Sequence, residues 1–290
     1  MRIVYHLGVH CTDEDRLIRC LLKNRATLAE EGIAVPSPTR YRTLLRDVAK
    51  QLRGARASEE SAAMVMDQII DDPSAERVVL SWTSFLNFPA FAVGNVLYGE
   101  GGERLYGFTQ IFPGAEAEFH LAIRNPATFL PELRRLVMNK GHGDVLQDVD
   151  PTGLRWSDTV HTIKEANPGV PLTVWCDEDA PLIWPELLQA ISGHGVETQL
   201  EDDEELLSDL MTEAGLLRYR TYCREHPPQT VSQRRRIVTA FLEKFGHPEK
   251  LTAEVDVPGW SGALVDKLTQ SYLRDVDRIA RIPGVRVIEP

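Results

Sequence analysis

The sequence has few cysteines and no long apolar run, and each shortage excludes a class of protein. Its four cysteines are widely spaced and form no CxxC pair, so neither a disulfide framework nor a zinc site is expected. No apolar run approaches the ~20 residues of a membrane span, and the first one breaks at His6 and Gly8, too early for a signal peptide. The sequence therefore predicts a cytoplasmic protein with reduced thiols.

Basic residues are also in the minority, with 32 Lys and Arg against 43 Asp and Glu and a net charge of -11. This balance disfavours non-specific binding to nucleic acid or to an anionic membrane, so we expect neither as a partner. What the chain does have is size and apolar content: 290 residues, 43% of them hydrophobic, are enough to bury a full core.

Short apolar runs alternate with helical periodicity through the first two thirds of the chain. Strands are expected at 3–7, 78–81, 119–123 and 171–176, and helices at 13–31, 44–52, 64–70 and 185–192. Runs that are apolar throughout and bounded by turn residues are typical of strands buried on both faces. The pattern predicts an α/β fold of three layers with a mostly parallel central sheet.

The last third of the chain is predicted to be helical. Helices are expected at 231–245 and 264–282, and we interpret Arg234 to Arg236 in the first of them as part of a solvated face. The sequence therefore predicts an α/β domain over residues 1–205 and a helical extension over 206–290 that packs on it.

The first segment has the layout of a phosphate-binding loop. A short strand runs through Gly8 into an amphipathic helix that ends at Gly32, an arrangement that presents backbone N–H groups to an anion. His6 to His10, then Thr12, and the helix end at Lys23 to Arg25 resemble the start of the bacterial P-loop sulfotransferases. These enzymes use 3′-phosphoadenosine 5′-phosphosulfate (PAPS) as the sulfuryl donor.

Two further segments extend this resemblance to roughly half of the chain. In Phe119 to Leu133 a strand ends at Arg124, Asn125 and Pro126 and a helix follows, which is similar to the strand and helix that bind the 3′-phosphate in the family. Residues 272–290 also resemble members of this group. The resemblance implies a P-loop-type fold and phosphate-binding roles for the residues that match, among them Gly8, His10 and Arg124.

The differences from the family fall on the loop positions that bind the donor. Cys11 stands for the lysine, Asp13 for a glycine, and Glu14 and Asp15 for hydroxyl residues, while Thr12 matches. Without the lysine, no ammonium group stabilises the negative charge that develops on the leaving phosphate during sulfuryl transfer. One carboxylate about 5 Å from a phosphate repels it by roughly 3 kcal/mol at an effective dielectric constant near 20.

The two other donor-binding segments differ in the same direction. The serine expected eight positions after Arg124 is Glu132, so Arg124 either binds an anion or pairs with an acid such as Glu132. Related bacterial enzymes often carry an acid near the position of Thr83, and here none follows until Glu100.

The acidic residues of the loop have three readings. Thr12 and Asp15 fit a capping box, and Asp13 and Glu14 would then lie in the first helical turn, where carboxylates complement the helix dipole. The second reading is a divalent-metal cluster, although contiguous acids lack the spacing of known carboxylate loops. The third is a rearranged ligand site.

The leading hypothesis is a sulfotransferase-like protein that has lost PAPS binding and catalysis, needs no cofactor or metal, and binds an unknown protein or small molecule. The alternative is an active sulfotransferase that uses PAPS and a hydroxyl acceptor such as a sugar. In it His10, the candidate catalytic residue, acts with Arg124 and with Arg16 or Arg19 in place of the lysine. Metal-dependent chemistry at the loop carboxylates and a Cys11–His10 nucleophile pair are further alternatives. The candidate site comprises Gly8, His10, Cys11, Thr12, Asp13, Glu14, Asp15, Arg124 and Glu132.

Overall fold

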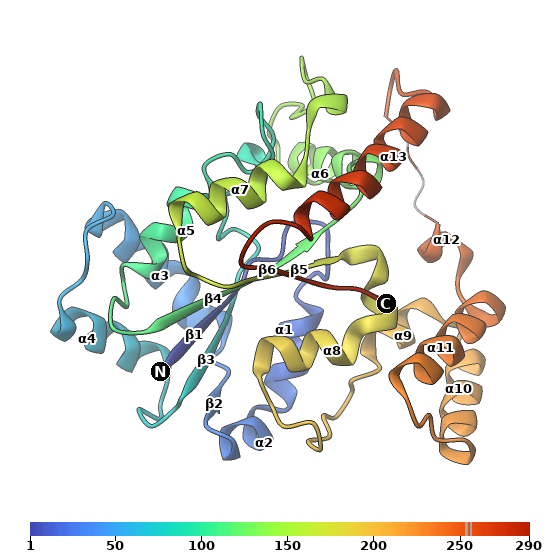
Figure 1. Cartoon of the computed structure of the whole chain (residues 1–290), viewed down its shortest axis with the longest axis horizontal. Helices are drawn as coiled ribbons and strands as arrows, with labels where there is room; N and C mark the ends of the chain where they lie inside the picture. The colour runs from blue at the N-terminus through green and yellow to red at the C-terminus, as the bar shows by residue number, and fades with distance from the viewer. Residues whose placement is uncertain (253–254, 256) are drawn as a thin grey trace.

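The centre of the molecule is a six-stranded sheet in the order β2-β3-β1-β4-β5-β6, in which all neighbouring strands are parallel (Figure 1). The computed structural model describes residues 1–252, 255 and 257–290. The strands are β1 (Arg2–His6), β2 (Ile33–Ala34), β3 (Arg77–Ser81), β4 (Glu116–Ile123), β5 (Leu172–Cys176) and β6 (Val285–Ile288). All four strands expected from the sequence are present, and β2 and β6 extend the sheet at its two edges.

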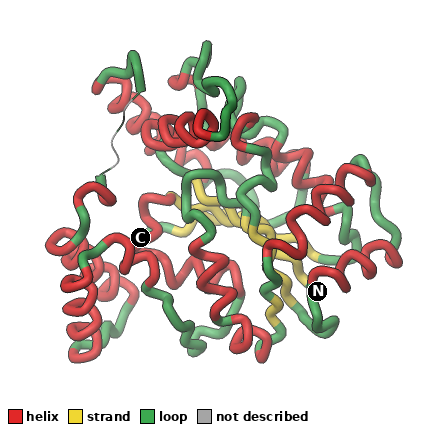
Figure 2. Tube along the Cα trace, turned by 180° about the vertical axis from the view of Figure 1, so that it is seen from behind, coloured by secondary structure: helices red, strands yellow, loops and turns green. Residues whose placement is uncertain are grey.

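Helices cover both faces of the sheet, so the fold has the three layers that the sequence predicts (Figures 1 and 2). One face is covered by α1 (Arg16–Lys23), α2 (Arg25–Glu30) and α8 (Ala180–Ser192). The other is covered by α3 (Pro38–Leu52), α4 (Glu59–Ile69), α5 (Gly101–Thr109), α6 (Pro126–Asn139), α7 (Trp156–Ala166) and α13 (Gly262–Ile279). Three short 3-10 helices are η1 (Pro89–Phe91), η2 (Pro151–Gly153) and η3 (Asp177–Asp179).

Successive side chains of each strand point to opposite faces and so build two cores. On β1, Ile3 and Tyr5 join the core beneath α3, α5 and α7, whereas Val4 joins the core beneath α1 and α8. Both sets are almost completely buried, which explains why the strands read as continuous apolar runs in the sequence.

The remaining helices form a lobe beside the sheet, visible at the lower right of Figure 1. They are α9 (Glu205–Leu210), α10 (Glu213–Glu225), α11 (Val231–Phe245) and α12 (Pro248–Leu251). A small core of their own holds α9, α10 and α11 together, and its buried residues are Leu207, Met211, Leu216, Tyr219 and Val238. The segment expected to be helical throughout also supplies β6, which pairs with β5, so residues on both sides of position 205 build the sheet.

Two details of the sequence prediction are wrong. The helix expected at 13–31 begins at Arg16 and breaks at Asn24, whose side-chain amide donates to the carbonyl oxygens of Cys20 and Glu201 instead of pointing to solvent. Arg234 and Arg235 do not form a solvated face, because both guanidinium groups contact the carboxylate of Glu186 in α8, at 2.8 and 3.3 Å.

Among the residues that the structure describes, the helices are each too short or too polar to cross a lipid bilayer.

Candidate functional site

The turn between β1 and α1 lies at the carboxyl edge of the sheet, where the turns after β3, β4 and β5 also lie. In an open parallel sheet this edge is the usual place for a ligand site. Gly8 has a φ of 75°, and a Cβ at this position would lie 3.0 Å from Cγ2 of Thr83. Glycine therefore allows the first turn to approach the turn that follows β3.

Three residues of the loop that are not glycine adopt left-handed backbone angles. The φ values are 60° at Cys11, 50° at Glu14 and 63° at Asp15. Each such conformation costs on the order of 1–2 kcal/mol for a residue with a Cβ. Contacts around the loop must hold this path, and they come from its own carboxylates and from two arginines.

Asp13 caps α1, and the expected capping box is not formed. Oδ2 of Asp13 accepts a hydrogen bond from the backbone N–H of Leu17 at 3.1 Å, and its carbonyl oxygen accepts from the N–H of Arg16 at 2.9 Å. Asp15 is the N-cap residue by position, but its side chain makes no capping bond, and the hydroxyl of Thr12 donates to the carbonyl oxygen of Val9. Asp13 therefore occupies amides at the helix start that an anion would otherwise meet.

Asp13 and Glu14 precede the helix instead of lying in its first turn, which corrects the sequence prediction. The carboxylate of Glu14 is exposed and lies 3.6 Å from the guanidinium of Arg16. Asp15 points the other way, toward Arg42 of α3, with 2.8 Å between Oδ1 and Nη2. Because the neighbouring carboxylates diverge, they do not form a metal cluster, and the described residues hold no group of three His, Cys, Asp or Glu that could bind a metal ion.

Arg42 links the loop to the end of β3. Its Nη2 also donates to the carbonyl oxygen of Ser81 at 3.0 Å, and the hydroxyl of Tyr41 donates to the same oxygen at 2.8 Å. The hydroxyl of Ser81 in turn contacts Nδ1 of His6 at 2.8 Å. Arg42 thus holds Asp15 in place by a contact between residues 27 positions apart in the sequence.

Arg124, at the end of β4, is bound to the protein's own groups. Its Nη1 lies 2.7 Å from Oε2 of Glu132 and donates to the carbonyl oxygen of Cys11 at 2.5 Å, while Nε donates to the hydroxyl of Thr128 at 3.2 Å. Arg124 was expected either to bind an anion or to pair with an acid, and the structure shows it paired with Glu132. The guanidinium ties the first loop to α6 through contacts that an anion would have to displace.

His10 and Cys11 are neighbours in the sequence but not partners in the structure. Nδ1 of His10 contacts the hydroxyl of Tyr98 at 2.8 Å, and Nε2 lies 3.3 Å from the hydroxyl of Ser84. Burial lowers the pKa of His10 to about 4. Burial, with Glu132 nearby, raises the pKa of Cys11 to about 12. The imidazole and the thiol are both neutral near pH 7, which argues against the Cys11–His10 nucleophile pair.

The two arginines of α1 face the neighbouring helix α9. Nε of Arg16 lies 2.8 Å from Oδ2 of Asp209, and Nε of Arg19 lies 3.6 Å from Oε1 of Glu205. Both side chains are thus bound to acids of the C-terminal third.

Sequence reasoning missed two residues at this edge. Asp177 follows β5 directly, and burial raises its pKa to about 8, while Arg124 acts in the opposite direction. The rule that side chains after parallel strands gather at one edge could have identified it, because the strand at 171–176 was expected. Arg42 lies in α3 beside the buried Tyr41, and nothing in its local sequence predicts a contact with the loop.

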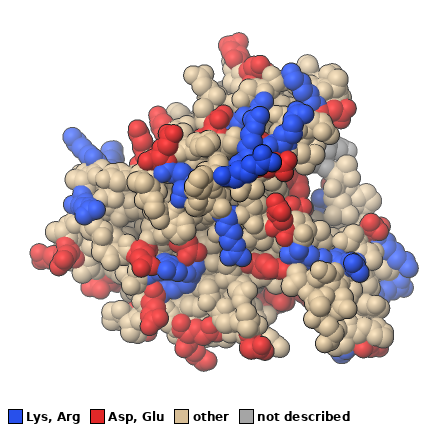
Figure 3. Space-filling view, in the orientation of Figure 1, with Lys and Arg blue, Asp and Glu red and all other residues tan. Residues whose placement is uncertain are grey.

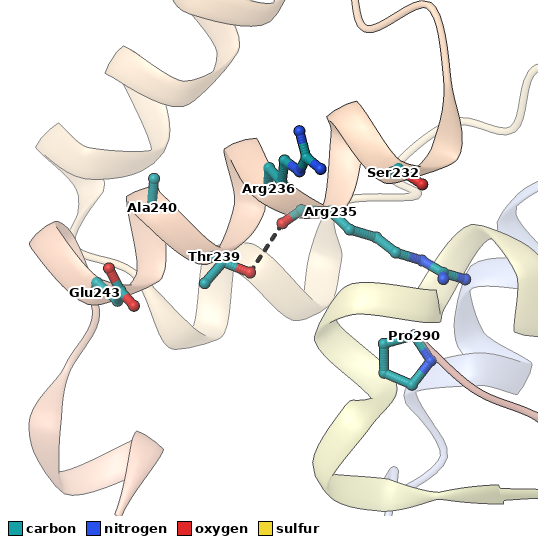
Figure 4. Close-up of a pocket in the computed structure, with 7 residues that line it drawn as sticks. All are labelled: Ser232, Arg235, Arg236, Thr239, Ala240, Glu243 and Pro290. Carbon is teal, nitrogen blue, oxygen red and sulfur yellow. Dashed lines mark hydrogen bonds between the residues drawn. The ribbon is translucent and has the colours of Figure 1, made fainter.

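Two surface pockets lie away from this loop. One, of about 490 Å³, is formed between α11 and Pro290, and Figure 4 shows the Arg235 side chain extending toward Pro290. The other, of about 370 Å³, is lined by residues between Asn87 and Glu100. Comparison of the chain with protein-family models, with curated proteins and with solved structures finds no match.

Proposed function

We propose that this chain is a sulfotransferase-like protein that has lost PAPS binding and catalysis and acts as a binding or scaffolding protein. The observation that carries the proposal is the engagement of Arg124 by Glu132 at 2.7 Å and by the carbonyl oxygen of Cys11. Arg124 is the residue to which the sequence resemblance assigns the 3′-phosphate, and here an acid of the same chain neutralises it.

The residues of the first loop do not fit a phosphosulfate. Oδ2 of Asp13 already accepts a hydrogen bond from the backbone N–H of Leu17, and Oδ1 is buried without a hydrogen-bond partner among the described residues. A phosphate brought to this helix start would meet that carboxylate. At an effective dielectric constant near 20, such a contact at about 5 Å opposes binding by roughly 3 kcal/mol, a factor of more than one hundred in affinity.

The contacts of the other residues argue against the active alternative. Arg16 and Arg19 are bound to Asp209 and Glu205, and the buried imidazole of His10 has a pKa of about 4. None of these three groups is placed as a free cation at the loop. We therefore retain the binding role, with an unidentified protein or small molecule as the partner and the cytoplasm as the compartment.

Isothermal titration calorimetry with 3′-phosphoadenosine 5′-phosphate tests the proposal. We expect no saturable heat up to a ligand concentration of about 1 mM, since the carboxylates of Asp13 and Glu132, at roughly 3 kcal/mol each, together move a micromolar site beyond that range. Saturable binding at micromolar concentration, or sulfation of any hydroxyl acceptor with PAPS, would overturn it.

A further inference from the structure

A row of basic side chains follows one side of α13. Lys267, Arg274 and Arg278 lie on the helix, and Arg281 lies just after its end. The spacing of seven, four and three residues places these four side chains within an arc of about 60° and over roughly 21 Å along the helix axis. All four are exposed. Figure 3 shows that Lys and Arg side chains gather over α13. We call Lys267, Arg274, Arg278 and Arg281 the basic row.

No carboxylate that the structure describes lies within ion-pair distance of the basic row. The arginines elsewhere around the sheet differ, since Arg16, Arg42 and Arg124 are each paired with an acid. Salt screens charges beyond about 8 Å at physiological ionic strength, so a ligand near α13 meets the basic row and not the net charge of -11. The row is therefore a local positive surface on an acidic protein.

The row is not needed to attach α13 to the body of the protein. The opposite side of the helix buries Leu268 and Ile279, and the hydroxyl of Tyr272 donates to Glu178 at 3.1 Å. The buried carboxylate of Asp275 accepts from the backbone N–H of Ser157 at 3.0 Å, at the start of α7. These contacts fix the helix, and the basic row projects from a rigid support.

We propose that the basic row binds an acidic segment of another protein. A span of roughly 21 Å matches six or seven residues of extended chain, or an acidic helix with carboxylates at the same spacing of three, four and seven. Arginine guanidinium groups bind carboxylates in pairs of parallel hydrogen bonds, and three of the four cations are arginines.

The surroundings of the row favour a protein over a membrane or a nucleic acid. A helix that lies in a membrane surface presents its apolar side to lipid, and α13 buries that side against α6 and α7, leaving Leu273 as its exposed large apolar residue. Asp266 and Asp277 are exposed and lie along one side of the row on the same helix, so a polymer with continuous negative charge meets repulsion along that side. A protein segment whose carboxylates are spaced like the basic residues places no negative charge next to these two aspartates.

This proposal goes beyond the proposed function and does not depend on it, because the row and the loop share no residue. Fluorescence anisotropy with a labelled alanine-based helical peptide that carries glutamates at the spacing of seven, four and three residues is the direct test, and the titration of 3′-phosphoadenosine 5′-phosphate reports separately on the loop. The variant that tests the row changes Lys267, Arg274, Arg278 and Arg281 to Ala. The matched control changes Arg25, Arg53, Arg224 and Arg236 to Ala, four exposed arginines without a described acid partner, so that the net charge of both variants is equal.

We expect saturable binding by the wild-type chain, at least about a tenfold loss in the row variant, and a change within about twofold in the control. The affinity of the wild-type chain should fall as salt rises from about 0.05 M to about 0.3 M. Equal losses in both variants, or no saturable binding, would overturn the proposal. So would tighter binding of an oligothymidylate or of phosphatidylserine vesicles through the same four residues, or a dimer of this chain that the row variant abolishes.

Discussion

Arg124 and Glu132 form an ion pair of 2.7 Å that joins the end of β4 to the second turn of α6. Both side chains are largely shielded from water, so their attraction is screened less than that of a surface pair, and Arg124 is withheld from any other anion. Removing the acid should therefore release a cation at the carboxyl edge of the sheet.

A combined change of Glu132→Ser, Asp13→Gly and Cys11→Lys should create binding of 3′-phosphoadenosine 5′-phosphate. The change removes two carboxylates and adds one ammonium, and each carboxylate at about 5 Å is worth roughly 3 kcal/mol. Calorimetry should then detect a dissociation constant in the micromolar range. Glu60→Ser, on the exposed surface of α4, is the control and should leave the wild-type result unchanged. A triple variant that folds and binds nothing would show that other features of the loop prevent binding.

His10 should make the protein less stable in acid. Its folded pKa of about 4 lies below the value of about 6.5 in an unfolded chain, so the unfolded state binds the proton first as pH falls. The stability associated with neutral His10 is present above about pH 6.5 and is lost as pH falls toward 4. Denaturant unfolding at about pH 7.5 and pH 4.5 should show that the wild-type chain loses about 2 kcal/mol more than His10→Gln. Equal losses in the two chains would contradict this assignment.

Asp177 should act in the opposite direction. Its folded pKa of about 8 lies above the ordinary value of 3.8, so the folded state holds a proton that the unfolded chain releases. The stability linked to that proton is complete below about pH 4 and is lost as pH rises through 8. Asp177→Asn keeps the neutral form, and we expect it to be more stable than the wild-type chain at about pH 8.5 by about 1–2 kcal/mol, after allowance for solvent screening.

Thermal unfolding at about pH 5 and pH 8.5 measures the effect of Asp177→Asn. The exposed Asp67→Asn on α4 provides the control and should show the wild-type pH dependence. The same pH dependence in Asp177→Asn and in the wild-type chain would refute the prediction.

Asp275→Ala should destabilise the protein strongly. The buried carboxylate accepts from the backbone N–H and the hydroxyl of Ser157, so its loss leaves two buried donors at the start of α7 without a partner. Unpaired buried donors cost about 1–3 kcal/mol each, and we expect a total loss of about 2–4 kcal/mol in urea unfolding. Asp275→Asn, which keeps one acceptor oxygen, should lose less than the alanine variant. A loss below about 0.5 kcal/mol in Asp275→Ala would show that water replaces the carboxylate.

Local pattern was enough to predict the central strands and the three layers. The runs at β1, β3, β4 and β5 are apolar on both faces, and this property is visible in any short window of the sequence. The edge strands were missed because β2 has two residues and β6 interrupts its apolar residues with the exposed Arg286. Short edge strands have little pattern to detect.

The candidate site was predicted less completely, because its contacts are distant in sequence. Thr12 and Asp15 have the spacing of a capping box, but the left-handed backbone at Asp15 turns its side chain to Arg42 and leaves the capping to Asp13. The pairing of Arg124 with Glu132 could be proposed from the sequence because eight residues separate them across a strand end and a helix start. The contact of Arg124 with Cys11 depends on how β1 and β4 pair, which no local pattern determines.

The position of β6 has a consequence for synthesis of the chain on the ribosome. The outer edge of β5 finds its partner only when Val285 to Ile288 have left the exit tunnel, after the whole lobe of α9 to α12 has been made. Until then the nascent chain exposes a row of unpaired backbone groups, the kind of edge that recruits chaperones or other strands. A fragment that stops at residue 205 would keep this exposed edge permanently and is expected to aggregate.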